Sequence, residues 1–198
     1  MEEKRIQEVE KRALLSSSEY EAVKNKLMKL GASYEGDVSV NDIYFCRKDT
    51  KSFSEVEMED VGSFSLRLRE QSTAGKPEET TMNVKVITSQ SDHNSWEEHE
   101  IMVGPMNEAA AILKAIGFKP FCTIRKKRFT YAIEGVSVIL EDIEDFGLGV
   151  EAEIMTTKDN EDSAKAKIDK VLSDIGIDSS KIVEKSITNI IMRERAEF

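Results

Sequence analysis

Apolar and polar residues alternate along several segments of the chain, and this alternation predicts β-strands. Successive side chains of a strand point to opposite faces of its sheet, so each segment offers one apolar and one polar face. The predicted strands are 5–14, 38–46, 63–70, 80–88, 95–103, 122–131, 136–142 and 149–155. The sequence therefore predicts a sheet of about eight strands.

Three further segments, each following a Glu-x-Glu pair, have apolar residues at helical spacing. They are predicted as helices over about 18–30, 107–116 and 161–175, each closing with a glycine, Gly31, Gly117 or Gly176. A glycine at this position supplies the left-handed residue that commonly ends a helix. The predicted apolar stripes include Tyr20, Val23, Leu27 and Leu30 in the first helix and Ala109, Ile112, Leu113 and Ile116 in the second. We expect these stripes to cover the apolar face of the sheet.

The polar face of the predicted strands carries charges of both signs. Its members are Glu8, Glu10, Arg12, Arg67, Arg69, Lys85, Glu98, Glu100, Lys126, Arg128, Glu141, Glu151 and Glu153. On an open sheet such a face is solvated and carries cross-strand ion pairs. In a closed barrel with helices outside, the same side chains line an interior that needs a charged occupant. Alternation alone leaves both arrangements open within the α+β class.

Overall charge and composition exclude several classes of protein. With 28 Lys+Arg against 38 Asp+Glu, the formal net charge of -10 argues against nonspecific binding to nucleic acid or to an anionic membrane. The sequence contains no apolar run near the ~20 residues that cross a bilayer, and its first residues are too charged for a signal peptide. We therefore expect a cytoplasmic protein with no nucleic-acid partner and no membrane.

Cysteine and histidine are too few for several kinds of chemistry. Cys46 and Cys122 lie far apart without metal-ligand spacing, and we expect them to be buried free thiols. His93 and His99 show no pattern of a nucleophile–histidine pair. Zinc chemistry and serine-type or cysteine-type catalysis are therefore not indicated.

The charged face suits a polyphosphate and a divalent cation together. Arginine binds phosphate through two parallel hydrogen bonds, and carboxylates are ligands for Mg²⁺ or Mn²⁺. Neither GxxxxGK(S/T) nor GxGxxG occurs in the sequence, so side chains rather than a backbone loop would hold the phosphates.

An ordered set of motifs resembles the CYTH superfamily, the triphosphate tunnel proteins. Glu8-Val9-Glu10-Lys11-Arg12 is similar to the family's Glu-x-Glu-x-Lys, with Arg12 in place of the lysine. The other matching motifs are Asn41-Asp42-Ile43-Tyr44-Phe45, Leu66-Arg67-Leu68-Arg69, Lys126-Lys127-Arg128, and Leu140-Glu141-Asp142-Ile143 followed by Glu151-Ala152-Glu153. Glu141 takes the place of the family's aspartate. The resemblance covers about residues 6–155 and, more loosely, the C-terminal helices.

The resemblance implies a closed antiparallel barrel of about eight strands, the triphosphate tunnel, with helices packed outside and residues 1–198 forming one domain. The implied triphosphate-binding residues are Arg12, Arg67, Arg69, Lys85, Lys126 and Arg128. The implied ligands of Mg²⁺ or Mn²⁺ are Glu8, Glu10, Glu151 and Glu153, and the implied catalytic residues are Lys85 and Glu141. Glu98 and Glu100 would either add metal ligands or neutralise neighbouring arginines.

The implied activity has two forms, an adenylyl cyclase of class IV type or a triphosphatase. The partner would be a small-molecule triphosphate such as ATP, thiamine triphosphate or inorganic triphosphate, and the protein would be a monomer or a homodimer. The strand 41–45 and Phe53 in the loop after it look closest to the cyclase-like prokaryotic branch. A polyphosphate- or nucleotide-binding protein without turnover is the alternative that the Arg12 and Glu141 departures keep open.

Overall fold

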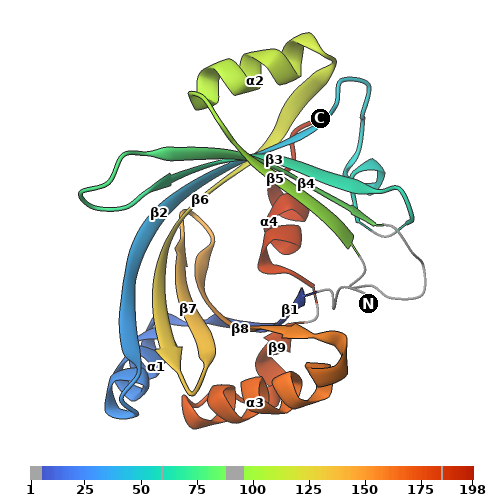
Figure 1. The fold of residues 1–198 in the computed structure, drawn as a ribbon. Helices are drawn as coiled ribbons and strands as arrows, with labels where there is room; N and C mark the ends of the chain where they lie inside the picture. Colours follow the sequence, from blue (N-terminus) through green and yellow to red (C-terminus); the bar gives the residue numbers. More distant parts are fainter. Residues whose placement is uncertain (1–5, 59, 88–95, 184) are drawn as a thin grey trace, which may run out of the picture. The chain divides into compact units, whose positions relative to one another are not determined.

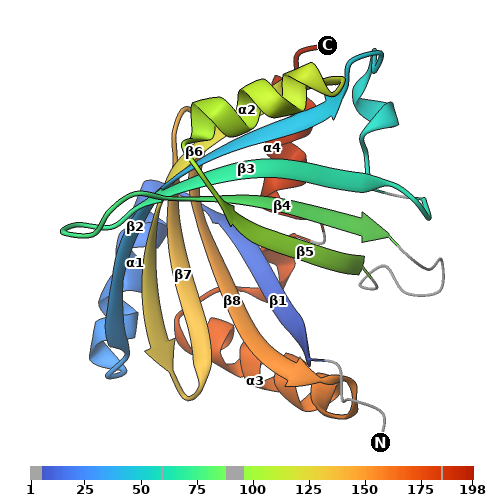
Figure 2. The same cartoon turned by 45° about the horizontal axis from the view of Figure 1, so that its top comes forward.

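The computed structural model describes residues 6–58, 60–87, 96–183 and 185–198. Its strands are β1 (Ile6–Leu15), β2 (Ser33–Arg47), β3 (Phe64–Ser72), β4 (Glu79–Ile87), β5 (Trp96–Val103), β6 (Phe118–Ile133), β7 (Val136–Ile143), β8 (Gly147–Thr157) and β9 (Ile182–Val183) (Figures 1 and 2). Its helices are α1 (Ser17–Lys29), α2 (Met106–Ala115), α3 (Glu161–Asp174) and α4 (Ile187–Arg195), with short 3-10 turns η1 (Phe53–Glu55), η2 (Lys158–Asn160) and η3 (Ser179–Lys181).

All the predicted strands and helices are present within a few residues of their expected bounds. Strand β9 was not predicted, because two residues are too short to show an alternating pattern. Three ends of predicted strands lie outside the described residues, namely Arg5, Thr88 and Ser95. His93 also lies outside them.

The strands form one nine-stranded sheet in the order β5-β4-β3-β2-β6-β7-β8-β1-β9. Strand pairs are antiparallel, as between β1 and β8, β3 and β4, and β7 and β8. The predicted α+β class is therefore confirmed. The order of the described strands begins at β5 and ends at β9, so closure into a barrel stays a prediction.

Backbone contacts divide the chain into two compact units. Unit 1 comprises residues 1–37 and 126–187, and unit 2 comprises residues 38–125 and 188–198. Strands β2 and β6 each run through both units. The candidate site residues fall in both units, and each unit is described by itself below.

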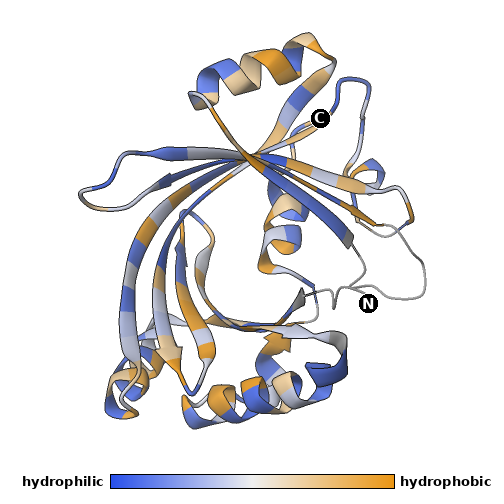
Figure 3. Cartoon of the chain, in the orientation of Figure 1, coloured by the Kyte–Doolittle hydropathy of each residue, from blue (hydrophilic) through white to orange (hydrophobic). Residues whose placement is uncertain are grey.

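Helices α1 and α3 cover the apolar face of β1, β7 and β8 in unit 1. Val138 and Leu140 of β7, Leu27 of α1 and Ile168 of α3 are fully buried in this core. Figure 3 shows hydrophobic and hydrophilic residues alternating along the strands, which is the pattern that predicted them. Burying this apolar face contributes most of the stabilisation, at about 25 cal/mol per Å² of apolar surface.

Helix α2 covers β3 and β4 in unit 2, but with a narrower face than predicted. Leu113 packs against Phe45, Leu66 and Leu68 in a buried cluster. Ile112 and Ile116 belong to the predicted apolar stripe, yet they are 62% and 65% exposed, respectively. The expectation for these two residues is wrong, because the face of α2 that packs against the sheet consists of Met106, Ala109, Ala110 and Leu113, and Ile116 follows the last residue of the helix.

Leu30, also in a predicted stripe, follows the last residue of α1 and is 48% exposed, so the expectation for this residue is wrong as well. The three closing glycines do adopt positive φ angles of 79°, 99° and 89° at Gly31, Gly117 and Gly176, as predicted. In the described part of the chain, no helix has the length and apolar character needed to cross a membrane.

Candidate functional site

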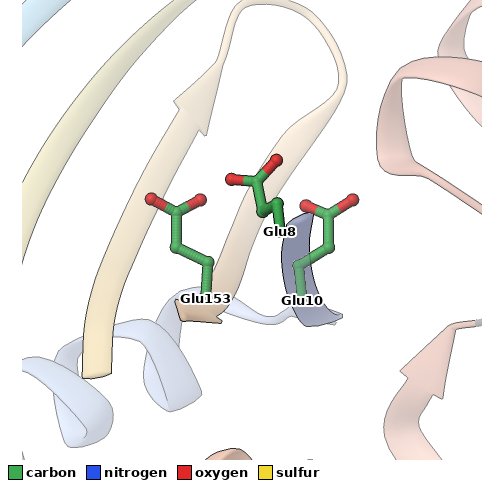
Figure 4. Close-up of side chains that lie close together, drawn as sticks. All are labelled: Glu8, Glu10 and Glu153. Atoms are coloured by element: carbon green, nitrogen blue, oxygen red, sulfur yellow. The ribbon is translucent and has the colours of Figure 1, made fainter. Parts of the chain in front are cut away.

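One group of candidate residues lies on the paired strands β1 and β8 of unit 1. In their register, Glu10 lies opposite Glu153. Glu8 precedes Glu10 by two residues, so both side chains leave the same face of β1. Figure 4 shows the carboxylates of Glu8, Glu10 and Glu153 close together, and each offers an oxygen within 4.8 Å of the other two. This carboxylate triad unites three of the predicted metal ligands.

The ionised carboxylates of the carboxylate triad repel one another. Burial, a hydrogen bond with Glu8 and the charge of Glu8 raise the pKa of Glu153 to about 7, while the charge of Arg128 opposes the shift. A divalent cation between these oxygens would replace the repulsion with attraction. Oxygen donors from carboxylates are the ligands that Mg²⁺ and Mn²⁺ prefer. The donor set therefore fits the metal that the sequence predicts.

The raised pKa of Glu153 predicts a pH-dependent affinity for the metal. Below about pH 7 a proton occupies Glu153 and competes with the cation, so we expect Mn²⁺ binding to tighten by up to tenfold per pH unit as the pH rises toward 7. Above pH 7 the dependence should level off. Calorimetric titration of Mn²⁺ between about pH 6 and pH 8 measures this, and Glu153→Gln should flatten the curve. Equal affinity across the range would contradict the assignment.

Glu151, the fourth predicted ligand, does not join the carboxylate triad. Its two oxygens lie 3.6 Å from Arg12 Nε and 3.5 Å from Arg128 Nη2, respectively. Burial and then the charge of Glu141 raise the pKa of Glu151, whereas the neighbouring cations lower it. In this structure Glu151 neutralises arginines, and its role as a metal ligand stays a prediction.

Glu141 is fully buried and holds two of the predicted phosphate-binding cations. Lys126 Nζ donates a hydrogen bond to Glu141 Oε1 at 2.5 Å, and Arg128 Nε lies 3.2 Å from the same oxygen. The second oxygen, Oε2, is buried and has no hydrogen-bond partner among the described residues. A longer side chain than the family's aspartate thus reaches two cations on the neighbouring strand. We infer that Glu141 orients Lys126 and Arg128.

These contacts join into one network across β1, β6, β7 and β8. Arg12 is buried, pairs with Glu10 of its own strand and lies close to Glu151, its partner on β8. The network contains more carboxylates than cations: Glu8, Glu10, Glu141, Glu151 and Glu153 against Arg12, Lys126 and Arg128. This excess of negative charge favours a bound cation and would oppose a bare polyphosphate.

A second group of candidate residues lies on β2, β3 and β4 of unit 2, and Arg69 is the most constrained of them. Its guanidinium donates two hydrogen bonds to the Asp42 carboxylate, from Nε at 2.7 Å and from Nη2 at 2.8 Å. The Asp42 side chain is only 2% exposed. Asp42 belongs to the motif Asn41-Asp42-Ile43-Tyr44-Phe45, but its pairing with Arg69 was not predicted. Arg69 therefore has a structural role in addition to any contact with phosphate.

Arg67 is the basic residue best placed to accept a ligand in unit 2. It lies between Tyr44 of β2 and Asn83 of β4 in the sheet register. Its Nε is buried and has no hydrogen-bond partner in the described part of the chain. The pKa of Tyr44 is raised to about 12, mainly by burial, although the charge and the hydrogen bond of Arg67 oppose the shift. The phenol therefore stays neutral. The guanidinium thus keeps donor capacity that no described carboxylate uses.

Lys85 and Glu98 form an ion pair beside Arg67. Lys85 Nζ lies 3.2 Å from Glu98 Oε2, and Asn83 Nδ2 donates a hydrogen bond to Glu98 Oε1 at 2.6 Å. Burial raises the pKa of Glu98, but the hydrogen bond from Asn83 and the charge of Lys85 more than offset this, so the net shift is downward. These contacts favour the neutralising role of Glu98 over metal binding. Asn83, buried in the same row, was missed because it carries no charge.

The remaining polar positions behave as the alternation predicted. Lys127 is exposed on the opposite side of β6 from Lys126 and Arg128, while Tyr131 is buried in the core of unit 1. Both cysteines, Cys46 and Cys122, are buried free thiols. The row chosen as the charged face of β6 is therefore confirmed.

A sequence model of the CYTH domain matches residues 7–187 of the chain. The match covers every residue of both groups described above. No match was found among curated proteins.

Several solved structures share the fold. A protein from Pyrococcus horikoshii superposes with a TM-score of 0.74 at 22% identity, covering 95% of this chain and 99% of its own. A candidate adenylate cyclase from Vibrio parahaemolyticus gives a TM-score of 0.72 at 16% identity, with 93% and 97% coverage. A candidate adenylyl cyclase from Hippeastrum, described as having a dominant triphosphatase activity, gives 0.67 at 17% identity, with 96% and 97% coverage. At these identities the similarity establishes the fold alone.

Proposed function

The chain belongs to the CYTH domain family, and we propose that it is a divalent-metal-dependent enzyme acting on a triphosphate. The observation that carries this proposal is the carboxylate triad of Glu8, Glu10 and Glu153. Three carboxylates that converge without a cation are unfavourable, and burial together with the neighbouring Glu8 raises the pKa of Glu153. Such an arrangement is expected where a metal ion is part of the working protein.

Each unit contains residues of the proposed triphosphate-binding set. In unit 1, Arg12, Lys126 and Arg128 are each held by a carboxylate of the network, which fixes the direction of their donors. In unit 2, Arg67 offers unused donor capacity and Lys85 is held by Glu98. Held donors lose less conformational entropy when a phosphate binds. We propose that these residues are the phosphate ligands of their own units, with Arg69 supporting Arg67 on the same face of β3.

Catalysis by this site would consist of positioning and charge neutralisation. Glu8, Glu10 and Glu153 would hold a Mg²⁺ or Mn²⁺ ion, and this ion would supply positive charge that neutralises the phosphates. Lys85, Lys126 and Arg128 would stabilise the negative charge that spreads over the phosphoryl oxygens in the transition state. Glu141 would act through Lys126 and Arg128, because its bonded oxygen faces them and its side chain is fully buried.

Two reactions are compatible with these roles. In a triphosphatase, water attacks the terminal phosphorus, a new P–O bond forms, and the bond to the diphosphate breaks. In a cyclase, the ribose 3′-hydroxyl attacks the α-phosphorus and pyrophosphate leaves. Both need the same clamp on the phosphate chain, so the fold does not choose between them.

Product analysis tests the proposal. The protein is incubated with ATP, inorganic triphosphate or thiamine triphosphate in the presence of Mg²⁺ or Mn²⁺, and the products are identified. Cyclic AMP with pyrophosphate indicates a cyclase, and orthophosphate indicates a triphosphatase. Tight metal-dependent binding without turnover of any substrate would support the binding-protein alternative and overturn the enzymatic proposal. Full turnover after exhaustive chelation would overturn the metal requirement.

A further inference from the structure

Unit 2 contains a cavity of about 350 Å³ that none of the roles above uses. It is lined by the end of β2, the loop that follows with η1, the start of β3, Phe121 of β6 and part of α4. This volume lies within the range of natural small-molecule pockets, about 300–1,000 Å³.

Four phenylalanine rings form part of the cavity wall, beside polar and charged side chains. Its apolar lining includes Phe45, Phe53, Phe64, Phe121 and Met192. Guanidinium groups lie over two of these rings, Arg193 at 5.5 Å from the Phe53 centroid and Arg47 at 5.7 Å from the Phe64 centroid. Arg193 is itself paired with Glu57 of the loop, which helps to fix the position of η1 beside α4. Flat rings bind to such walls by stacking on phenyl faces and guanidinium planes.

Hydroxyl groups also line the cavity, one of which, Ser63 Oγ, already accepts a hydrogen bond from Asp60 N at 3.3 Å. Thr50, Ser63 and Ser65 are part of the lining. Hydroxyls can both donate and accept, so they suit the mixed donors and acceptors on the edge of a heteroaromatic ring. A cationic ring would stack less well on Phe53 or Phe64, because a guanidinium group already lies over each of these rings, although Asp49 and Glu55 also belong to the cavity lining.

The cavity adjoins the proposed phosphate-binding row within the same unit. Ser65 lines the cavity and precedes Arg67 by two residues, on the same face of β3. At a rise of about 3.3 Å per residue, the two positions are roughly 7 Å apart along the strand. A phosphate on Arg67 would therefore leave an attached organic group within reach of the cavity.

We propose that this cavity binds the uncharged heteroaromatic base of a nucleoside triphosphate, and that the substrate of the chain is such a nucleotide rather than inorganic triphosphate. The inference rests on the proposed function, because it uses Arg67 as a phosphate ligand. It assigns the choice of substrate to the loop between β2 and β3 and to α4. Phe53 is the residue whose ring should stack on the base.

Substitution of Phe53 tests the inference. Calorimetric titrations in Mg²⁺ compare ATP with inorganic triphosphate for the parent protein, Phe53→Ala and Phe53→Tyr. Loss of one base-stacking ring should weaken ATP binding by about 5- to 150-fold and leave inorganic triphosphate within about twofold of the parent. Phe53→Tyr should retain the affinity for ATP. Val61→Ala is the matched control, since Val61 lies exposed in the same loop and outside the cavity lining.

The outcomes separate this inference from the proposed function. If the parent binds neither ATP nor inorganic triphosphate, the proposed function fails and the inference fails with it. If the parent binds inorganic triphosphate as tightly as ATP, and Phe53→Ala changes neither, only the inference is overturned. Equal weakening of both ligands in Phe53→Ala would also overturn it, as would a preference for thiamine triphosphate that depends on Phe53.

Discussion

Replacing Glu10 and Glu153 together with glutamine is expected to abolish the response to divalent metal and reduce turnover by at least 100-fold. The change removes two of the three charges of the carboxylate triad while keeping the side-chain shape. Residues that only support a metal ligand typically contribute 10- to 100-fold to metal affinity or activity, so direct ligands should contribute at least as much. Calorimetric titration of Mn²⁺ and turnover assays across Mn²⁺ concentrations measure both effects.

The fold of this double variant should survive without metal. Burial and the neighbouring Glu8 raise the pKa of Glu153, so a neutral side chain at that position removes a repulsion rather than an attraction. Replacing Glu10 removes a charged partner of the buried Arg12, but Glu151 Oε1 still lies 3.6 Å from Arg12 Nε and offsets this loss. The matched control is Glu21→Gln, which removes an exposed charge from α1 in the same unit. A double variant that binds Mn²⁺ as tightly as the parent would contradict the assignment of the metal site.

The alternating sequence pattern predicted which face each charged residue occupies. Arg67 and Arg69 alternate with the buried residues Leu66 and Leu68, as the pattern requires. Lys126 and Arg128 pair with acidic residues, whereas Lys127 is exposed, so even the ambiguous strand was assigned correctly. The face of a side chain depends only on its position within its own strand, and for this reason it can be read locally.

The partners of these residues could not be predicted in the same way. Glu151 and Glu153 occupy one row of β8, yet only Glu153 joins the carboxylate triad because the register places it opposite Glu10 and Glu151 opposite Arg12. Register is fixed by the packing of the whole sheet. The contact between Asp42 and Arg69 likewise joins two strands. Asn83 and Glu98 also lie on different strands, so their hydrogen bond could be predicted only with the pairing of those strands.

Replacing Arg67 and Arg69 with alanine, one at a time, is expected to affect different properties. Loss of Arg69 should lower the stability of the fold, and loss of Arg67 should weaken triphosphate binding. Arg69→Ala removes the two hydrogen bonds that Arg69 donates to the buried Asp42 carboxylate, and loss of one member of a buried ion pair typically costs about 3–5 kcal/mol of unfolding free energy. Arg67→Ala removes a side chain with no described carboxylate partner, so stability should change little. Its loss should instead weaken triphosphate binding by about 1.5–3 kcal/mol, the value of a charge-assisted hydrogen bond.

Denaturant unfolding and calorimetric titration with a triphosphate, applied to both variants, measure the two effects. The Asp42→Ala, Arg69→Ala double variant completes a thermodynamic cycle, and it should be less destabilised than the sum of its single substitutions because neither buried charge is left alone. Arg69→Ala with the stability of the parent would show that the Asp42 pair is not stabilising. Parent-like triphosphate binding by Arg67→Ala would show that the charged row of β3 does not contact the phosphate chain, and the proposed binding site in unit 2 would then be wrong.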